Sequence, residues 1–167
     1  MSYIDKSLGA GETVIARAHF HWLYNLAAWL WLLVPLAALG YAYHQAQSQP
    51  DPLTIGTGVL FVIGLFVFLR MMGRKWSTEI GITSHRFVER YGLLAMRTNE
   101  IALPNIEGVR VNQSILGRVF GYGTVRIEGT GVDSVTTPTI ADPVGFVRAI
   151  QTAREHTAAR FEAGRTA

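Results

Sequence analysis

Two long stretches without charge constrain this chain more than any other feature of its sequence. Between Phe20 and Leu69 the only formal charge is Asp51. Residues 26–43 run for about 18 positions without a charge, and residues 53–69 for about 17. A helix that crosses the hydrocarbon core of a bilayer needs about 20 apolar residues, and each stretch reaches that length once its flanks are included. The sequence therefore predicts two membrane-spanning helices, at about residues 22–43 and 53–72.

The composition of these two segments favours membrane spans over the alternatives. Aromatic side chains crowd the ends of the first segment, as in the belts that lie at membrane interfaces; they are Trp22, Tyr24, Trp29, Trp31, Tyr41 and Tyr43. A cleaved signal peptide would have a shorter apolar stretch and no second span directly after it. Two core helices of a soluble protein would each show a polar face, which neither segment has.

The flanking charges predict the orientation of this hairpin. The connector, residues 44–52, contains no Lys or Arg, whereas the outer flanks carry both. The basic residues of these flanks are Lys6 and Arg17 before the first span and Arg70, Arg74 and Lys75 at the end of the second. By the positive-inside rule both termini lie in the cytoplasm and the connector lies outside. We therefore expect a multi-pass protein of the cytoplasmic (inner) membrane.

After the second span the pattern changes to short alternating segments separated by turn residues, which is typical of a small β-barrel or sandwich. The predicted strands are residues 79–83, 86–91, 97–103, 106–111, 124–128 and 134–140, with a short helix at 114–120. A final helix begins at Asp142 and Pro143, with an apolar stripe at Phe146, Ile150, Ala153 and Thr157. Residues 12–19, before the first span, alternate as well and can supply a seventh strand.

The chain thus divides into three predicted regions. Residues 1–21 form a cytoplasmic N-terminal segment that can add a strand to the sheet. Residues 22–72 form the transmembrane helical hairpin, and residues 73–167 form a cytoplasmic domain that ends in a helix.

One stretch of the chain carries a family resemblance. The segment RYGLLAMRTNEIALPNIEGVRVNQSILGRVFGYGTVRIEGTG, residues 90–131, resembles the bacterial pleckstrin-homology (PH) domain of membrane-flanked proteins. The start of the chain, YIDKSLGAGETVIARAHFHWLYNL, looks like the leader that such proteins place before their first span. The resemblance implies an α+β membrane protein: a two-helix transmembrane hairpin plus a small PH-like β-barrel or sandwich closed by a C-terminal helix. It implies no activity for particular residues.

We find no pattern for chemistry. The glycines between residues 117 and 131 lack the Gly-Lys-Ser/Thr of a phosphate loop. His19 and His21 are too few ligands for a closed metal site, and there is no cysteine. Glutamates alternate with arginines along the strands, as in cross-strand ion pairs on a solvated sheet face. We therefore expect no enzyme, no catalytic, cofactor or metal site, no small-molecule substrate and no nucleic-acid partner.

Two sets of residues remain as candidates for contact with a partner or with lipid. The first is basic and would face anionic lipid; it comprises Arg70, Arg74, Lys75, Arg86, Arg90 and Arg97. The second is apolar and would contact a partner or the bilayer; it comprises Leu93, Leu94 and Met96. The main hypothesis is a non-catalytic, membrane-anchored PH-like module that assembles with itself or with a protein partner. The alternatives are a sensor of anionic lipid headgroups and an accessory subunit of a transport or membrane-stress complex.

Overall fold

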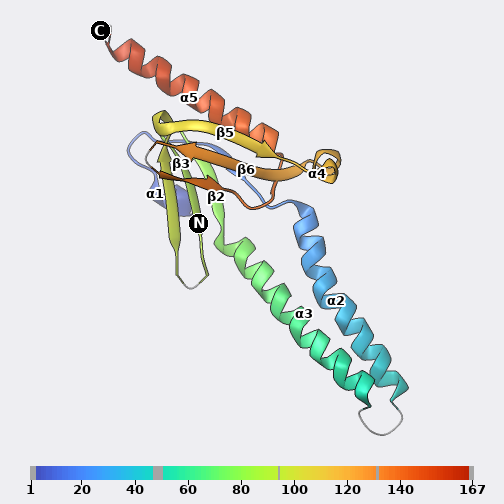
Figure 1. The fold of residues 1–167 in the computed structure, drawn as a ribbon. Coiled ribbons are helices and arrows are strands. Elements are labelled where there is room, and N and C mark those ends of the chain that lie inside the picture. Colours follow the sequence, from blue (N-terminus) through green and yellow to red (C-terminus); the bar gives the residue numbers. More distant parts are fainter. Residues whose placement is uncertain (1–2, 47–50, 94, 131, 166–167) are drawn as a thin grey trace. The chain divides into compact units, whose positions relative to one another are not determined.

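The computed structural model describes residues 3–46, 51–93, 95–130 and 132–165, and the chain divides into two compact units (Figure 1). One unit, called here the β unit, joins Met1–His21 to Ser77–Ala167. The other, the hairpin unit, is Trp22–Trp76. The β unit is therefore discontinuous in sequence, because the whole hairpin is inserted into it.

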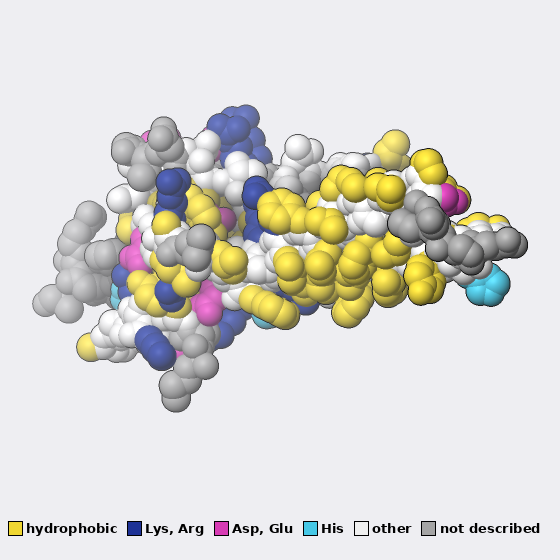
Figure 2. Space-filling model, turned by 90° about the horizontal axis from the view of Figure 1, so that it is seen from below, with side chains coloured by type: hydrophobic (Ala, Val, Ile, Leu, Met, Phe, Trp, Pro, Cys, Tyr) yellow, Lys and Arg dark blue, Asp and Glu magenta, His cyan; other side chains and the backbone are white. Residues whose placement is uncertain are grey.

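The hairpin unit consists of two long helices, α2 (Trp22–Gln45) and α3 (Pro52–Ser77). Both are long and apolar enough to cross a membrane, and only 11% of the most apolar window of each is buried. A core helix of a soluble protein would instead be mostly buried. Figure 2 shows hydrophobic side chains over much of the hairpin, whereas basic and acidic side chains are interspersed on the β unit. These are two candidate membrane helices.

Close packing of the two helices occurs around Pro35 of α2. Proline has no N–H, so Pro35 cannot donate the helical hydrogen bond that the carbonyl of Trp31 would otherwise accept. Gly64 of α3 lies against this carbonyl, and a Cβ at position 64 would stand only 2.2 Å from the Trp31 oxygen. At the open end of the hairpin, Lys75 Nζ donates to Asn25 Oδ1 over 2.8 Å.

Two four-stranded antiparallel sheets form the β unit. The first has the strand order β1 (Val14–Ala18), β2 (Glu79–Thr83), β3 (Arg86–Tyr91) and β4 (Arg97–Ala102). The second has β5 (Ile106–Asn112), β6 (Tyr122–Gly129) and β7 (Val132–Thr136), with β8 (Ile140–Ala141) also paired to β6. The predicted fold class, a helical hairpin with antiparallel sheets and a C-terminal helix, is confirmed.

The segment before the first long helix completes the first sheet. Strand β1 pairs with β2 through Ala18 opposite Ile80 and Arg17 opposite Gly81, although the entire hairpin separates the two strands in sequence. This pairing agrees with the alternation of residues 12–19. The β unit therefore needs both of its chain segments to form its sheet.

The main hydrophobic core lies between the sheets and α5 (Pro143–Arg165). Its largest buried side chains include Phe87, Ile82, Leu103, Ile127 and Ile150. The predicted stripe of α5 faces this core, because Phe146, Ile150 and Ala153 are at most 5% exposed. Asp142 caps α5: its Oδ1 accepts from Gly145 N at 2.9 Å, and Pro143 occupies the first position of the helix.

The strand count differs from the prediction. We expected seven strands with one continuous segment at 134–140, whereas the described part of the chain has eight, because this segment divides into β7 and β8. Pro138 lies between them and cannot donate to a ladder. The hydroxyl of Thr137 replaces a ladder bond by accepting from Val125 N at 3.0 Å. Among the residues that the structure describes, three short helices complete the unit: α1 (Tyr3–Ser7), η1 (Leu103–Asn105) and α4 (Ile115–Phe120).

Candidate functional site

Helix α1 covers the face of the first sheet that points away from the core. Ile4 of α1 is 1% exposed and Val88 of β3 is 0% exposed, yet neither belongs to the main core cluster. Gly81 of β2 makes room for this contact, since a Cβ there would lie 2.8 Å from Ile4 Cδ1. The N-terminal segment thus forms a small second core on the outer side of the sheet.

Polar contacts hold α1 in the same place. Glu79 Oε2 accepts from the backbone N–H groups of Tyr3, at 2.8 Å, and Ile4, at 3.3 Å. These N–H groups have no acceptor within the helix, so the carboxylate of Glu79 satisfies their hydrogen bonding. Its negative charge also interacts favourably with the helix dipole. The guanidinium of Arg90 lies 4.0 Å from the centre of the Tyr3 ring, a cation–π contact. Arg90 is therefore engaged by the chain's own N-terminal segment.

Arg86 is the centre of a larger network. Its Nε and Nη2 atoms donate to the two carboxylate oxygens of Glu12, each over 3.0 Å. Its Nη1 donates to Glu100 at 2.8 Å, and Nη2 also donates to the carbonyl of Ser7. Such a bidentate arrangement is the strongest geometry for an arginine–carboxylate pair. Arg86 links the N-terminal segment to β3 and β4.

The electrostatics of this network are fixed by Glu12, whose side chain is only 6% exposed. Burial alone raises the pKa of the Glu12 carboxyl, but hydrogen bonds from Gly9 N, Thr83 Oγ1 and Arg86 outweigh it and hold that pKa below its usual value of 4.5. Burial also lowers the pKa of Arg86, but its hydrogen bond to Glu12 and the charge of Glu100 leave that pKa raised. Both partners of the pair are therefore charged at neutral pH.

The remaining residues of the predicted basic set occupy different surroundings. Arg97, at the start of β4, is exposed, and so are Arg70 and Arg74 on α3. Lys75 is half-buried and bonded to Asn25. Within the β unit, the guanidinium groups of Arg86 and Arg90 make intramolecular contacts. The assignment of these residues to lipid binding stays a prediction.

The predicted apolar set lies in the connection between β3 and β4. Leu93 is 64% exposed and Met96 is 54% exposed. Leu94 lies outside the described residues. Of the glutamates expected on solvated sheet faces, Glu89 is an exception: it is 5% exposed, because it lies on the core side of β3, where Asn99 Nδ2 donates to it at 3.1 Å.

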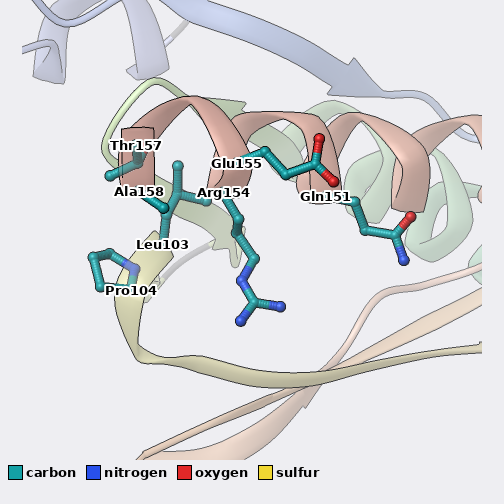
Figure 3. Close-up of a pocket in the computed structure, with 7 residues that line it drawn as sticks. All are labelled: Leu103, Pro104, Gln151, Arg154, Glu155, Thr157 and Ala158. Carbon is teal, nitrogen blue, oxygen red and sulfur yellow. The ribbon is translucent and has the colours of Figure 1, made fainter. Parts of the chain in front are cut away.

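An open groove of about 660 Å³ runs between η1 and α5 (Figure 3). It is lined by Leu103, Pro104, Gln151, Arg154, Glu155, Thr157 and Ala158. Two hydrogen bonds fix its walls to the turn between β2 and β3: Leu103 N donates to the carbonyl of His85 at 3.0 Å, and Thr157 Oγ1 donates to that of Ser84 at 3.2 Å. Its lining mixes charged and apolar side chains.

Residues 3–46, 51–93, 95–130 and 132–165 contain no group of three or more His, Cys, Asp or Glu side chains placed to hold a metal ion. His21 is 5% exposed, and its ring lies 5.3 Å from the ring of Tyr122. This histidine therefore packs inside the β unit, next to Tyr122, the first residue of strand β6.

Sequence reasoning missed three parts of this arrangement. It did not assign α1, and it did not pair Glu12 with Arg86. It predicted a helix at 114–120 but no exposed apolar face on it. The structure leaves four apolar side chains of α4 exposed: Ile115 by 84%, Leu116 by 61%, Val119 by 74% and Phe120 by 47%. Their apolar character was readable in the sequence, but their direction depends on the packing of the helix.

The comparisons with known proteins agree with this architecture. The family model for the Bacterial PH domain matches residues 13–154, a range that includes β1, both long helices and about half of α5. No curated protein and no solved structure matches the chain significantly. Because the family model spans most of the sequence, including the inserted hairpin, the chain belongs to the Bacterial PH domain family.

Proposed function

We propose that this protein is a non-catalytic assembly module, anchored by α2 and α3 and carrying its PH-like β unit on the cytoplasmic face of the membrane. The orientation follows from the basic flanks of the hairpin and the absence of Lys and Arg from residues 44–52. In this arrangement the helices supply attachment, and the β unit is free to bind a second copy of the chain or another protein.

One observation favours assembly over lipid sensing: two of the strand arginines of the basic set are engaged by the chain itself. Arg86 is bonded to Glu12 and Glu100, and Arg90 lies over Tyr3. A headgroup sensor needs cations that are free to meet phosphates. Two of the three strand arginines that would form such a site already have intramolecular partners, which supports a module that recognises protein.

The groove between η1 and α5 is the surface that we assign to the partner. Pro104 and Ala158 are its exposed apolar residues, whereas Arg154 and Glu155 offer opposite charges on one helix. Hydrogen bonds from Thr157 and Leu103 to the carbonyls of Ser84 and His85 hold α5 and η1, the two sides of the groove, to the β2–β3 turn. A partner with both an apolar side chain and a charged side chain at its contact point would fit this lining.

The test uses the full chain in nanodiscs as bait, because a fragment from Trp76 onward would lack β1. We expect wild type to recover a second copy or a protein partner, and the charge reversal Arg154→Glu together with Pro104→Asp to reduce that recovery at least about ten-fold, as expected when a contact of about 1.4 kcal/mol is lost. Arg110→Glu is the matched control, since Arg110 is exposed on β5. Equal recovery by the groove variant and wild type would contradict the proposal.

The lipid-sensor alternative has its own arm in the same system. Nanodiscs of neutral and anionic lipid are compared by hydrogen exchange, using Arg70→Gln and Arg97→Gln as variants. Arg86 is unsuitable for this purpose because its substitution would disturb the network with Glu12. The sensor would be favoured by protection of β-unit amides that appears only with anionic lipid and is lost in the variants. This protection should also weaken as salt rises, since exposed charges are screened over about 8–10 Å at physiological salt.

A further inference from the structure

Strand register places both connections to the hairpin at one end of the β unit. Ala18 of β1 lies opposite Ile80 of β2. His21 follows Ala18 by three positions, and Ser77 precedes Ile80 by three, so the chain leaves and re-enters the unit side by side. We call this the junction end.

The same register puts the β3–β4 connection at the junction end. Glu79 pairs with Arg90, and the next ladder position pairs Tyr91 with Arg97. The connection between these strands therefore extends past the point where β2 begins. It carries the exposed side chains of Leu93 and Met96.

Helix α4 belongs to the junction end through the second sheet. The carbonyl of His19 accepts from Ala141 N at 2.8 Å, and Ala141 pairs with Tyr122, the first residue of β6. The ring of His21 also contacts the Tyr122 ring. Because α4 ends two residues before Tyr122, it projects from this end, at the tip of β5 and β6 (Figure 1).

The fold of α4 forces its apolar side chains outward. Ser114 caps the helix by accepting from Gly117 N at 3.0 Å, and Gly121 ends it with φ 73°. Gly117 is the buried residue of α4, and a Cβ there would lie 2.6 Å from the Tyr122 carbonyl oxygen. The helix thus packs on β6 through a glycine, and none of the exposed residues named above belongs to the core cluster.

We propose that α4 and the β3–β4 connection enter the membrane interface as two apolar feet, one on each sheet, which seat the β unit on the bilayer. Exposed tryptophans mark both connections: Trp22 follows His21 and is 54% exposed, and Trp76 precedes Ser77 and is 77% exposed. Tryptophan at such positions is typical of the headgroup level. Feet at the same end of the unit then meet the boundary between headgroups and acyl chains, where apolar faces of short helices bind.

This inference rests on the proposed membrane anchoring, and the experiment separates the two. The chain has no cysteine, so single cysteines can carry a fluorescent label in the full chain reconstituted into liposomes. The probes are Val119→Cys on α4 and Leu93→Cys in the β3–β4 connection. Val62→Cys, on an exposed position of α3, reports the anchor, and Asn105→Cys, exposed in η1, is the control remote from the junction end.

Quenching by nitroxide lipids is compared with quenching by aqueous iodide. We expect lipid quenching at Val119 and Leu93 to be several-fold above that at Asn105, because apolar faces of interfacial helices are buried about 5–10 Å at the boundary between headgroups and acyl chains. Lipid quenching at Val62 should report the spanning helix. Labels at Val119 and Leu93 that respond to iodide alone would overturn the proposal and leave the anchoring intact. Labels that respond to neither quencher would also overturn it, since a protein would then cover these residues. An unquenched Val62 would overturn the anchoring as well.

Discussion

Arg86 on β3 donates two hydrogen bonds of 3.0 Å to the two carboxylate oxygens of Glu12, a residue 74 positions earlier in the chain. The whole hairpin lies between these partners in sequence. The pair therefore fastens the segment before the first helix to the sheet that follows the second. A β unit cut at Trp76 would lose β1, leaving β2 as an unpaired edge.

Replacing Glu12 by Gln should destabilise the β unit by about 1–3 kcal/mol, because the amide cannot reproduce charge-assisted bonds to Arg86, Thr83 and Gly9 in a site that is 6% exposed. The measurement is unfolding of the full chain in detergent micelles, with hydrogen exchange of the β1 amides alongside. A loss of about 1.4 kcal/mol, within that range, would make these amides exchange roughly ten-fold faster.

The matched control for this substitution is Glu128→Gln. Glu128 pairs with Arg110 and Arg126, whose side chains are 74% and 54% exposed. Exposed ion pairs contribute about 0–1 kcal/mol, so this variant should unfold close to wild type. Equal effects of the two substitutions would show that the Glu12 network does not hold β1 in place.

Acid should weaken the same attachment. The pKa of Glu12 is below 4.5 in the folded chain, so the unfolded chain takes up the proton at a higher pH than the folded one. The stabilisation is fully present above about pH 4.5 and is lost as the pH falls through the folded pKa. In pH-dependent hydrogen exchange of β1, the difference between wild type and Glu12→Gln should be constant at neutral pH and narrow below pH 4.5. A difference that widens in acid would contradict this assignment.

The contact between α1 and the sheet can be tested by a double-mutant cycle. Gly81→Ala should cost about 1–3 kcal/mol, since its Cβ would lie 2.8 Å from Ile4 Cδ1 and 3.3 Å from the Ala16 carbonyl oxygen. Ile4→Ala alone should cost about 2 kcal/mol through loss of a buried side chain. In the double variant the clash with Ile4 is gone, so the combined loss should be smaller than the sum. Additive losses in thermal unfolding would argue against direct packing.

The sequence predicted those parts of the fold that depend on local patterns. The alternation of apolar and polar residues predicted the strands, and the pair Asp142 and Pro143 predicted the start of α5. Helix α1 was missed because five residues are too few to show a helical period. The bond between Glu12 and Arg86 depends on register across an inserted hairpin, which no local pattern contains.

The candidate surfaces divide in the same way. The exposure of Leu93 follows from its place between two strands. The outward direction of α4 does not follow from its sequence, because it depends on the approach of Gly117 to the Tyr122 carbonyl. The groove beside α5 joins residues about 50 positions apart, from Leu103 to Thr157, and only the packed fold brings them together.

The orientation of the hairpin stays a prediction that reporter fusions can test. A reporter that is active only outside the cytoplasm should be silent when fused after Ala167 and active when inserted at Gln47, because basic residues flank the spans and are absent between them. The two fusions serve as each other's controls. The reverse pattern would place the β unit outside the cytoplasm and remove the basis of the proposed cytoplasmic assembly.

The hairpin itself should depend on Gly64. In Gly64→Ala the new Cβ would lie 2.2 Å from the Trp31 carbonyl oxygen and 3.0 Å from Pro35 Cγ, so α3 must move away from α2. Backbone cannot yield as a flexible side chain can, and we expect a loss of about 1–3 kcal/mol, as for overpacking elsewhere. Gly56→Ala is the matched control on the same helix, because nothing lies within 4 Å of its Cβ. Unfolding in micelles, followed by tryptophan fluorescence, should show a lower midpoint for Gly64→Ala and no loss for Gly56→Ala. A Gly64→Ala chain as stable as its control would mean that the two helices do not pack closely at Pro35.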